Sequence, residues 1–166
     1  MCNLGYNLSY NTYRGDYTAL TEEEKLFVAT VAGEMIGEAE ITWKIVANVI
    51  MNRVGKREWK KYTTVTDVIK YSGFDAYSKN TTEFQKAKQY LNSRGAQTNT
   101  RYENLINIVL PIYRKQTTDI TNGAQLYYSP KSMTPTGSKP AWDFSQLEEI
   151  TFSGVDQNTI KVYRYK

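Results

Sequence analysis

Two apolar stripes at helical spacing, separated by the acidic pair Glu34 and Glu38, restrict the fold of this chain more than any other feature of its sequence. Apolar residues recur every three or four positions over Leu26–Ile36, and again over Ile45–Val54. This spacing places them on one face of a helix. The pattern therefore predicts two consecutive helices that share one core, with the two acids at the break between them.

Capping residues mark the limits of these helices. Glu24 follows Thr21 at the spacing of a capping box, so the first helix is predicted to begin there. Gly37 is a natural end for this helix, which puts Glu34 in its last turn. The second helix is predicted to begin at about Ile41.

The rest of the chain divides into a helical part and a β-rich part. Three further segments have helical composition: Val65–Tyr71, Thr82–Leu91 and Tyr102–Lys115. Pro111 is predicted to kink the last of these helices or to start a new turn, because proline lacks a backbone donor. β-branched and aromatic runs then alternate with turn residues in three places: Gln125–Ser129, Glu149–Ser153 and Thr159–Tyr165.

The length of 166 residues suffices for one sizeable core but not for two. Residues 1–20 show little helical periodicity and are rich in Asn, Tyr and Gly, so they are predicted to form an extended arm. The prediction is one α+β domain over residues 21–166, with about five helices and a small C-terminal antiparallel sheet.

The residue types present exclude several kinds of chemistry. Cys2 is the only cysteine and the chain has no histidine, which excludes an internal disulfide, a Cys/His zinc site and a histidine-activated nucleophile. Carboxylates remain as the groups that can transfer protons near neutral pH, and no metal or cofactor is predicted.

The net charge of +4 favours anionic partners but does not choose among nucleic acid, a membrane surface and a cell wall. A basic run is formed by Lys56, Arg57, Lys60 and Lys61, either as a solvated face or as an anion-docking patch. The chain carries no recognised nucleic-acid motif, so no nucleic-acid partner is predicted. No apolar run approaches the roughly 18 residues needed to span a bilayer, and a signal-peptide pattern is absent.

Glu34 is the candidate for proton-transfer chemistry. Its position faces the negative end of the helix dipole, and apolar neighbours such as Val31 and Met35 are expected to desolvate it, so both effects raise its pKa. A carboxylic acid that keeps its proton near neutral pH can protonate a glycosidic oxygen. The alternative from spacing alone is a solvated charge at a helix end.

The stretch Val31–Val54 resembles the signature of the cell wall hydrolase family that includes the spore cortex-lytic enzymes. The shared elements are Gly33-Glu34, Gly37-Glu38 and Asn52-Arg53-Val54, without insertion or deletion between them. Further shared elements are Val68-Ile69, Gly73, the segment Phe74–Tyr77, the segment Gly123–Lys131 and Trp142. The resemblance covers roughly Leu26 to the C-terminus.

This resemblance implies an enzyme with a lysozyme-like helical core that cleaves the glycan strands of peptidoglycan between N-acetylmuramic acid and N-acetylglucosamine. Several family members resemble lytic transglycosylases, which leave a 1,6-anhydro end. The catalytic acid of the family corresponds to Glu34. One carboxylate suffices for that reaction, first as the acid and then as the base.

The resemblance also points to residues that contact substrate. The loop at Phe74 corresponds to the active-site loop of the family, and the strand at Tyr127 to the strand that lines the cleft. The candidate substrate-binding residues are Glu38, Phe74, Asp75, Tyr127, Tyr128 and Trp142. Glu38 has the alternative of holding the turn between the helices, the aromatic residues have the alternative of packing, and Asn52 and Arg53 are predicted to tie the helix end to the sheet.

Three positions depart from the family pattern. Glutamine is usual where Phe74 or Asp75 stands and where Trp43 stands, and a histidine is common near the C-terminal strand. Asp75 is a new acid, which raises the alternative of a muramidase that uses Glu34 with Asp75. The departures also leave open a non-catalytic wall-binding protein of a virion.

Without a signal-peptide pattern, an enzyme acting at the bacterial wall needs another route of delivery. A holin or a phage particle would supply one, so a bacteriophage endolysin or a lysin associated with phage tail or virion proteins is the expected setting.

Overall fold

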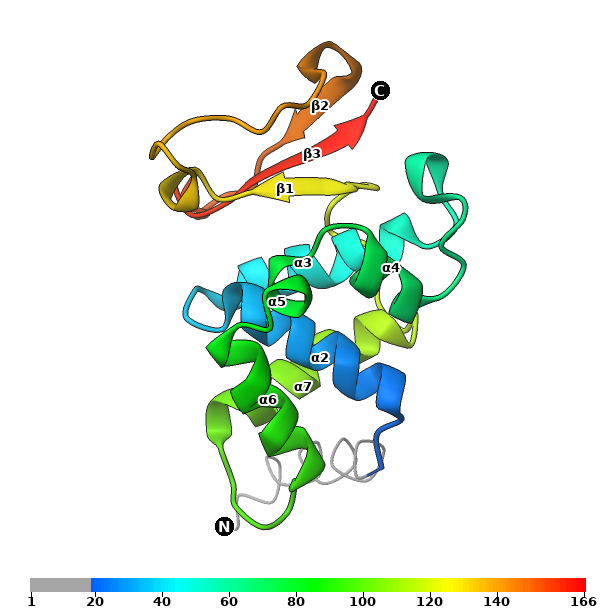
Figure 1. The fold of residues 1–166 in the computed structure, drawn as a ribbon, viewed down its shortest axis with the longest axis vertical. Helices are drawn as coiled ribbons and strands as arrows, with labels where there is room; N and C mark the ends of the chain where they lie inside the picture. The colour runs from blue at the N-terminus through cyan, green and yellow to red at the C-terminus, as the bar shows by residue number, and fades with distance from the viewer. Residues whose placement is uncertain (1–18) are drawn as a thin grey trace, which may run out of the picture.

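The structure is a computed structural model and describes residues 19–166, so nearly all of the predicted arm over residues 1–20 lies outside the described residues. A body of helices carries a small β-sheet at one end (Figure 1). The described part of the chain holds six α-helices and one three-stranded antiparallel sheet, which confirms the α+β prediction.

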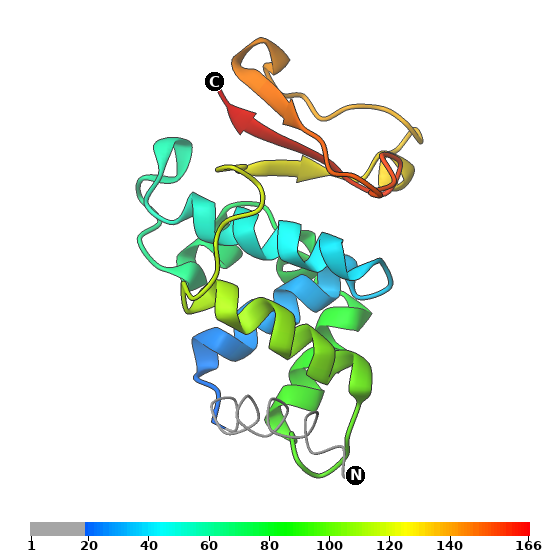
Figure 2. The same cartoon turned by 180° about the vertical axis from the view of Figure 1, so that it is seen from behind.

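Helix α2 is the centre of the helical body. The helices are α2 (Glu22–Met35), α3 (Glu40–Arg53), α4 (Val65–Tyr71), α5 (Asp75–Ser78), α6 (Thr82–Asn92) and α7 (Thr100–Tyr113). All of the other five pack against α2, α3 or both, and α7 crosses these two on the side seen in Figure 2. Every residue from Phe27 to Ala32 is buried, as expected of a helix that is covered on nearly all sides. Each large side chain buried there stabilises the fold by roughly 1.5–3 kcal/mol.

The predicted helix limits hold at most ends. Thr21 and Glu24 form the capping box, in which each side chain accepts a hydrogen bond from the backbone N–H of the other residue. Thr64 caps α4 with its side chain, which accepts a hydrogen bond from the backbone N–H of Asp67. Helix α7 runs through Pro111 and ends two residues later, so the proline marks the last turn of this helix.

The sheet has the strand order β1-β3-β2, with β1 (Leu126–Tyr128) nearest to the helices (Figure 1). Both neighbours of β3 (Lys161–Tyr165) are antiparallel to it, and Tyr163 pairs with Leu126 on one side and with Glu149 on the other. β2 spans Leu147–Ile150, which places it about two residues earlier than the predicted run. Three 3₁₀ turns complete the described elements: η1 (Arg57–Trp59), η2 (Pro130–Ser132) and η3 (Phe144–Gln146).

Long-range hydrogen bonds join the end of α3 to the loop that leads into β1. The Asn52 side-chain amide lies within hydrogen-bonding distance of Asp119 Oδ2 (2.9 Å), Thr121 Oγ1 (3.2 Å) and the Ala124 carbonyl (3.0 Å). These contacts agree with the prediction that the residue ties the helix end to the C-terminal part. Within residues 19–166, none of the helices has the length and apolar character that a bilayer span requires.

Candidate functional site

A cavity of about 340 Å³ lies between the end of α2, the segment around α5 and the strand β1. Five of the seven residues predicted for the site line it: Glu34, Phe74, Asp75, Tyr127 and Tyr128. They come from three parts of the chain that are far apart in sequence. The fold thus places five residues that were predicted separately around one cavity.

Gly33 allows α5 to approach the end of α2. A Cβ atom at this position would lie 2.5 Å from Ala76 Cβ and 2.9 Å from Phe84 Cβ, so any larger residue would push α5 and α6 away. The close approach brings the backbone N–H of Ala76 to within 2.8 Å of Glu34 Oε1, to which it donates. The glycine next to Glu34 thereby supports the position of its carboxylate.

The second oxygen of Glu34 faces the sheet. The Tyr127 hydroxyl donates a hydrogen bond to Glu34 Oε2 at 2.8 Å, across 93 residues of sequence. Glu34 therefore spans the cavity edge between α5 and β1, with one oxygen bonded on each side.

Burial raises the pKa of Glu34 above its usual value. The hydrogen bonds from Ala76 and Tyr127 lower its pKa, because they favour the charged form, and the negative charge of Asp75 raises it. The net shift of the Glu34 pKa is upward, as predicted, and burial is its largest cause. Burial also raises the pKa of Tyr127, so that its hydroxyl stays protonated near neutral pH.

Arg53 brings a positive charge to the cavity wall. Its Nε donates to the Gln125 carbonyl at 2.7 Å and its Nη1 to the Ser72 carbonyl at 2.7 Å, so it ties α3 to both sides of the cavity. The guanidinium lies 4.7 Å from the ring centres of Trp59 and Phe74. Burial lowers the pKa of Arg53 to about 10, so the side chain remains charged at neutral pH.

Phe74 and Asp75 differ in exposure although they are neighbours. Phe74 is buried, and its ring centre lies 6.3 Å from that of Tyr127. Asp75 is exposed with 63% of its side chain accessible, and its carboxylate pairs with Lys79 at 2.8 Å. Asp75 is thus a solvated acid at the cavity rim, whereas Phe74 supports the wall.

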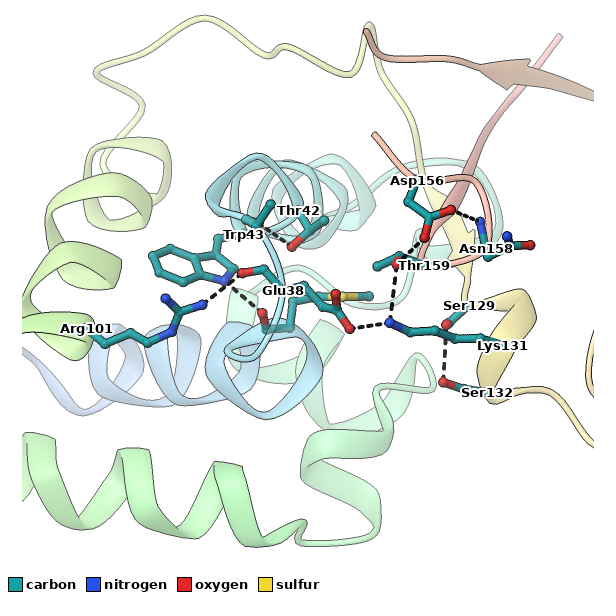
Figure 3. A network of polar contacts seen from close by, with 12 residues as sticks. Glu38, Thr42, Trp43, Arg101, Ser129, Lys131, Ser132, Asp156, Asn158 and Thr159 are labelled. Atoms are coloured by element: carbon teal, nitrogen blue, oxygen red, sulfur yellow. Dashed lines mark hydrogen bonds and ion pairs between the residues drawn. The ribbon is translucent and has the colours of Figure 1, made fainter. Parts of the chain in front are cut away.

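The turn after α2 is held by side chains from two other helices (Figure 3). Trp43 Nε1 donates to the Met35 carbonyl at 2.8 Å. Arg101 donates to the carbonyls of Ile36 at 2.7 Å and Glu38 at 3.0 Å, and its guanidinium lies 4.9 Å from the Trp43 ring centre. Carbonyl groups at the C-terminal end of a helix lack hydrogen-bond donors within the helix. The side chains of Trp43 and Arg101 supply these donors.

Glu38 lies outside the cavity lining. Its carboxylate accepts a hydrogen bond from Lys131 Nζ, which also donates to Thr159 Oγ1 at 3.2 Å (Figure 3). Lys131 belongs to η2, whose residue Ser132 lines the cavity. The Glu38 carboxylate therefore joins the turn after α2 to the sheet side of the cavity.

Trp142 also lies outside the cavity lining. Its ring packs edge-on against Tyr128 at 5.7 Å and against Tyr163 at 6.1 Å, in a second apolar cluster on the sheet. Trp142 thus packs on the sheet, next to the cavity-lining residue Tyr128.

Several cavity residues escaped the sequence-based prediction. Ser129, Ser132 and Met133 line the sheet side, and Thr81 lines the helical side. Ser129 and Lys131 lie in the segment Gly123–Lys131, which resembles the family, so this segment could have pointed to both residues. Arg101 had no such signal, because it acts on carbonyls more than 60 residues earlier in the chain. Within the described residues, no group of three or more His, Cys, Asp and Glu side chains is arranged to hold a metal ion.

Comparison with known proteins assigns the chain to a family. The model of a family described as Cell Wall Hydrolase matches residues 37–153, which is more than two thirds of the chain. The matched range includes Glu38, Asp75 and Tyr127 and begins three residues after Glu34. No curated protein and no solved structure matches this chain. The chain therefore belongs to the cell wall hydrolase family, and this membership supports a peptidoglycan-degrading activity.

Proposed function

We propose that the protein cleaves the glycan strands of peptidoglycan between N-acetylmuramic acid and N-acetylglucosamine as a lytic transglycosylase, with Glu34 as its acid and base. The observation that carries this proposal is the place of Glu34. It lines a cavity, its pKa is raised by burial, and fixed groups from α5 and β1 bind both of its oxygens.

The reaction needs two proton transfers, one from Glu34 to the substrate and one from the substrate back to Glu34. Protonated Glu34 gives its proton to the glycosidic oxygen as the bond from this oxygen to C1 of the muramic residue breaks. The resulting carboxylate then takes the proton of the C6 hydroxyl as O6 bonds to C1. The products are a free hydroxyl on one sugar and a 1,6-anhydro ring on the other, and Glu34 is protonated again.

The neighbours of Glu34 suit both of its states. When Glu34 is charged after the first step, the N–H of Ala76 and the hydroxyl of Tyr127 stabilise the carboxylate. The positive charge of Arg53 also favours this charged form. Substrate contacts are proposed for the cavity-lining residues Phe74, Asp75, Tyr127 and Tyr128, whereas Glu38 and Trp142 are proposed to act by holding the walls.

A second candidate reaction rests on Asp75, which lines the same cavity as Glu34. In a hydrolytic muramidase, Asp75 would steady the oxocarbenium ion or activate a water molecule. The product would then have a reducing muramic end in place of the anhydro ring.

Mass spectrometry of the soluble fragments separates the two reactions, because the anhydro product is lighter than the hydrolytic product by one water molecule. We expect anhydro ends from the wild-type protein. We also expect the Asp75→Asn variant to keep at least about a tenth of the wild-type rate. In the transglycosylase reaction Asp75 only changes the electrostatic potential near Glu34, which contributes less to the rate than the acid itself. Reducing ends, together with loss of activity in Asp75→Asn, would instead assign the muramidase reaction.

A further inference from the structure

A second hollow, of about 390 Å³, lies beyond the end of α3. Four cationic residues line it: Lys56, Arg57, Arg164 and Lys166. Among the described residues that line it, Glu148 is the one with an acidic side chain. The basic run seen in the sequence therefore meets cations from the C-terminal strand at this place.

The net charge of the chain is concentrated here. We define the basic cluster as Lys56, Arg57, Lys60, Lys61, Arg164 and Lys166. Glu58 and Glu148 are the acids interspersed with it, so these eight residues together carry +4, which equals the net charge of all 166 residues. The rest of the chain is balanced, and the basic character of the protein comes from this one region.

Within the described residues, most of these cations form no ion pair with an acidic side chain. Among residues 19–166, Arg164 is the one member of the cluster that forms an ion pair, with Glu148 at 2.7 Å. Arg57 donates to the main-chain oxygen of Lys166 and Lys166 Nζ to that of Ser145, at 2.9 Å in both cases. By contrast, seven ion pairs are formed by cations outside the cluster. The cluster thus presents positive charge that the described part of the fold does not neutralise.

Aromatic contacts hold the two halves of the cluster together. Trp59 packs edge-on against Tyr165 at 6.1 Å, and the Arg57 guanidinium lies 4.8 Å from the Tyr165 ring centre. Arg57 keeps a φ of +42°, a conformation that costs free energy for a residue with a side chain. The loop over residues 56–61 is therefore fixed against the end of β3, and its four cationic side chains are exposed.

The basic cluster adjoins the cavity of Glu34. Arg53 separates them, with Trp59 of the cluster side and Phe74 of the cavity wall each 4.7 Å from its guanidinium. Gln125 lines the hollow of the cluster and accepts a hydrogen bond from Arg53 through its carbonyl. A polymer held at the cluster would lie beside the reaction site.

We propose that the basic cluster binds a wall polymer of repeated phosphodiester units, the kind of polyanion that is attached to peptidoglycan. Exposed cations spread over two segments suit many evenly spaced anions better than one small ion, and guanidinium groups pair well with phosphate oxygens. Binding there raises the local concentration of the enzyme at its substrate. The choice of a wall polymer rests on the proposed function, whereas the binding itself does not require glycan cleavage.

The test measures retention on purified walls in the Glu34→Gln background, in which the wall stays intact. One variant carries Lys56→Gln, Lys60→Gln and Lys61→Gln. A control variant of equal charge carries Lys44→Gln, Lys88→Gln and Lys115→Gln, at exposed positions away from the cluster. Each is tested on intact walls, on walls stripped of phosphodiester polymer by hydrofluoric acid, and on double-stranded DNA.

We expect the cluster variant to bind intact walls about tenfold more weakly than the Glu34→Gln parent and to lose most of the salt sensitivity of binding, because three exposed ion pairs each contribute modestly. We expect the control variant to bind as the parent does, and the parent to bind stripped walls as weakly as the cluster variant. Three results would overturn the proposal: equal binding of the parent to intact and stripped walls, equal loss in the two triple variants, or retention on DNA as tight as on walls. Activity on soluble glycan strands reports separately on the proposed reaction. We expect this activity to be unchanged when the three cluster substitutions are made in the protein that retains Glu34.

Discussion

At the scale of single residues, the two oxygens of Glu34 are not equivalent. Oε1 accepts from the backbone N–H of Ala76, which can only donate, whereas Oε2 faces the Tyr127 hydroxyl, which can also accept. When Glu34 is protonated, its proton therefore belongs on Oε2. A proton on Oε2 leaves the hydrogen bond from Ala76 to Oε1 unchanged in both states.

The pH dependence follows from the direction of the Glu34 shift. Because burial raises its pKa, the acid form persists to a higher pH than for an exposed glutamate. The value of kcat/KM requires the acid form, so it should fall as the pH rises through this raised pKa.

The Tyr127→Phe substitution should move that fall to higher pH. The Tyr127 hydroxyl stabilises the carboxylate, so its removal makes the acid form of Glu34 still more favourable. The measurement is kcat/KM on purified walls across the pH range for both proteins.

Tyr77→Phe is the matched control, because the Tyr77 ring packs against Phe84 and does not line the cavity. Its pH profile should coincide with that of the wild-type protein. A Tyr127→Phe profile that is unchanged or moved to lower pH would contradict the role given to this hydroxyl.

At the scale of elements, the end of α2 depends on groups that are remote in sequence. Arg101 of α7 and Trp43 of α3 satisfy three carbonyls of the turn that follows Glu34. A positive charge at the C-terminal end of a helix also stabilises its dipole. Glu34 is therefore positioned by the packing of three helices together.

Arg101→Ala should lower kcat more than it changes KM, because the substitution removes two hydrogen bonds near Glu34 without removing a residue of the cavity lining. We expect it to reduce the free energy of unfolding by about 1–2 kcal/mol. Arg101→Lys keeps the positive charge but loses the paired N–H donors of the guanidinium. Its kcat and its free energy of unfolding should lie between those of the wild-type protein and Arg101→Ala. Steady-state kinetics with denaturant unfolding tests this, and an unchanged kcat in Arg101→Ala would refute the positioning role.

At the scale of the whole molecule, the sequence predicts the parts that have a local cause. Apolar periodicity and the Thr21 capping box predict α2, and periodicity alone predicts most of α3. The sequence does not predict helix α5, because a helix of four residues carries no periodic signal. The predicted strand lies about two residues later than β2, because Leu147–Ile150 lacks an apolar alternation and its position is fixed by pairing with β3.

The same division applies to the candidate site. Glu34 and Tyr127 lie in motifs that resemble the family, so both were predicted, and the raised pKa of Glu34 was expected from apolar surroundings. The contacts of Glu38 with Lys131 and of Arg101 with the α2 turn join residues more than 60 positions apart. One sequence without aligned relatives contains no information on such pairs.

Asn52 links the helical body to the approach to the sheet, so its loss should weaken the whole fold. We expect Asn52→Ala to reduce the free energy of unfolding by about 2 kcal/mol near neutral pH, since it strips hydrogen bonds from Asp119 and from a buried carbonyl. Urea unfolding measures this difference.

The effect of Asn52→Ala should also depend on pH. Burial alone would raise the pKa of Asp119, but hydrogen bonds from Thr121, Asn52 and Gly123 lower it below the usual 3.8. A carboxylate with a lowered pKa stabilises the fold fully when the pH is above its usual pKa. This contribution is lost as the pH falls through the lowered pKa. The stability difference between the two proteins should therefore shrink below the usual pKa of aspartate, and a difference that grows in acid would contradict the account.

The measurement that bears most directly on the central claim is the clearing of purified peptidoglycan walls by the wild-type protein and by Glu34→Gln. Glutamine keeps the shape of the side chain but cannot act as a proton donor near neutral pH. We therefore predict clearing by the wild-type protein and a clearing rate at least about a hundredfold lower in the variant. The variant should unfold at the same denaturant concentration as the wild-type protein or a higher one, because burial of a charged group is relieved. Walls cleared at comparable rates by both proteins, or cleared by neither, would contradict the claim that Glu34 is the acid of a wall-degrading enzyme.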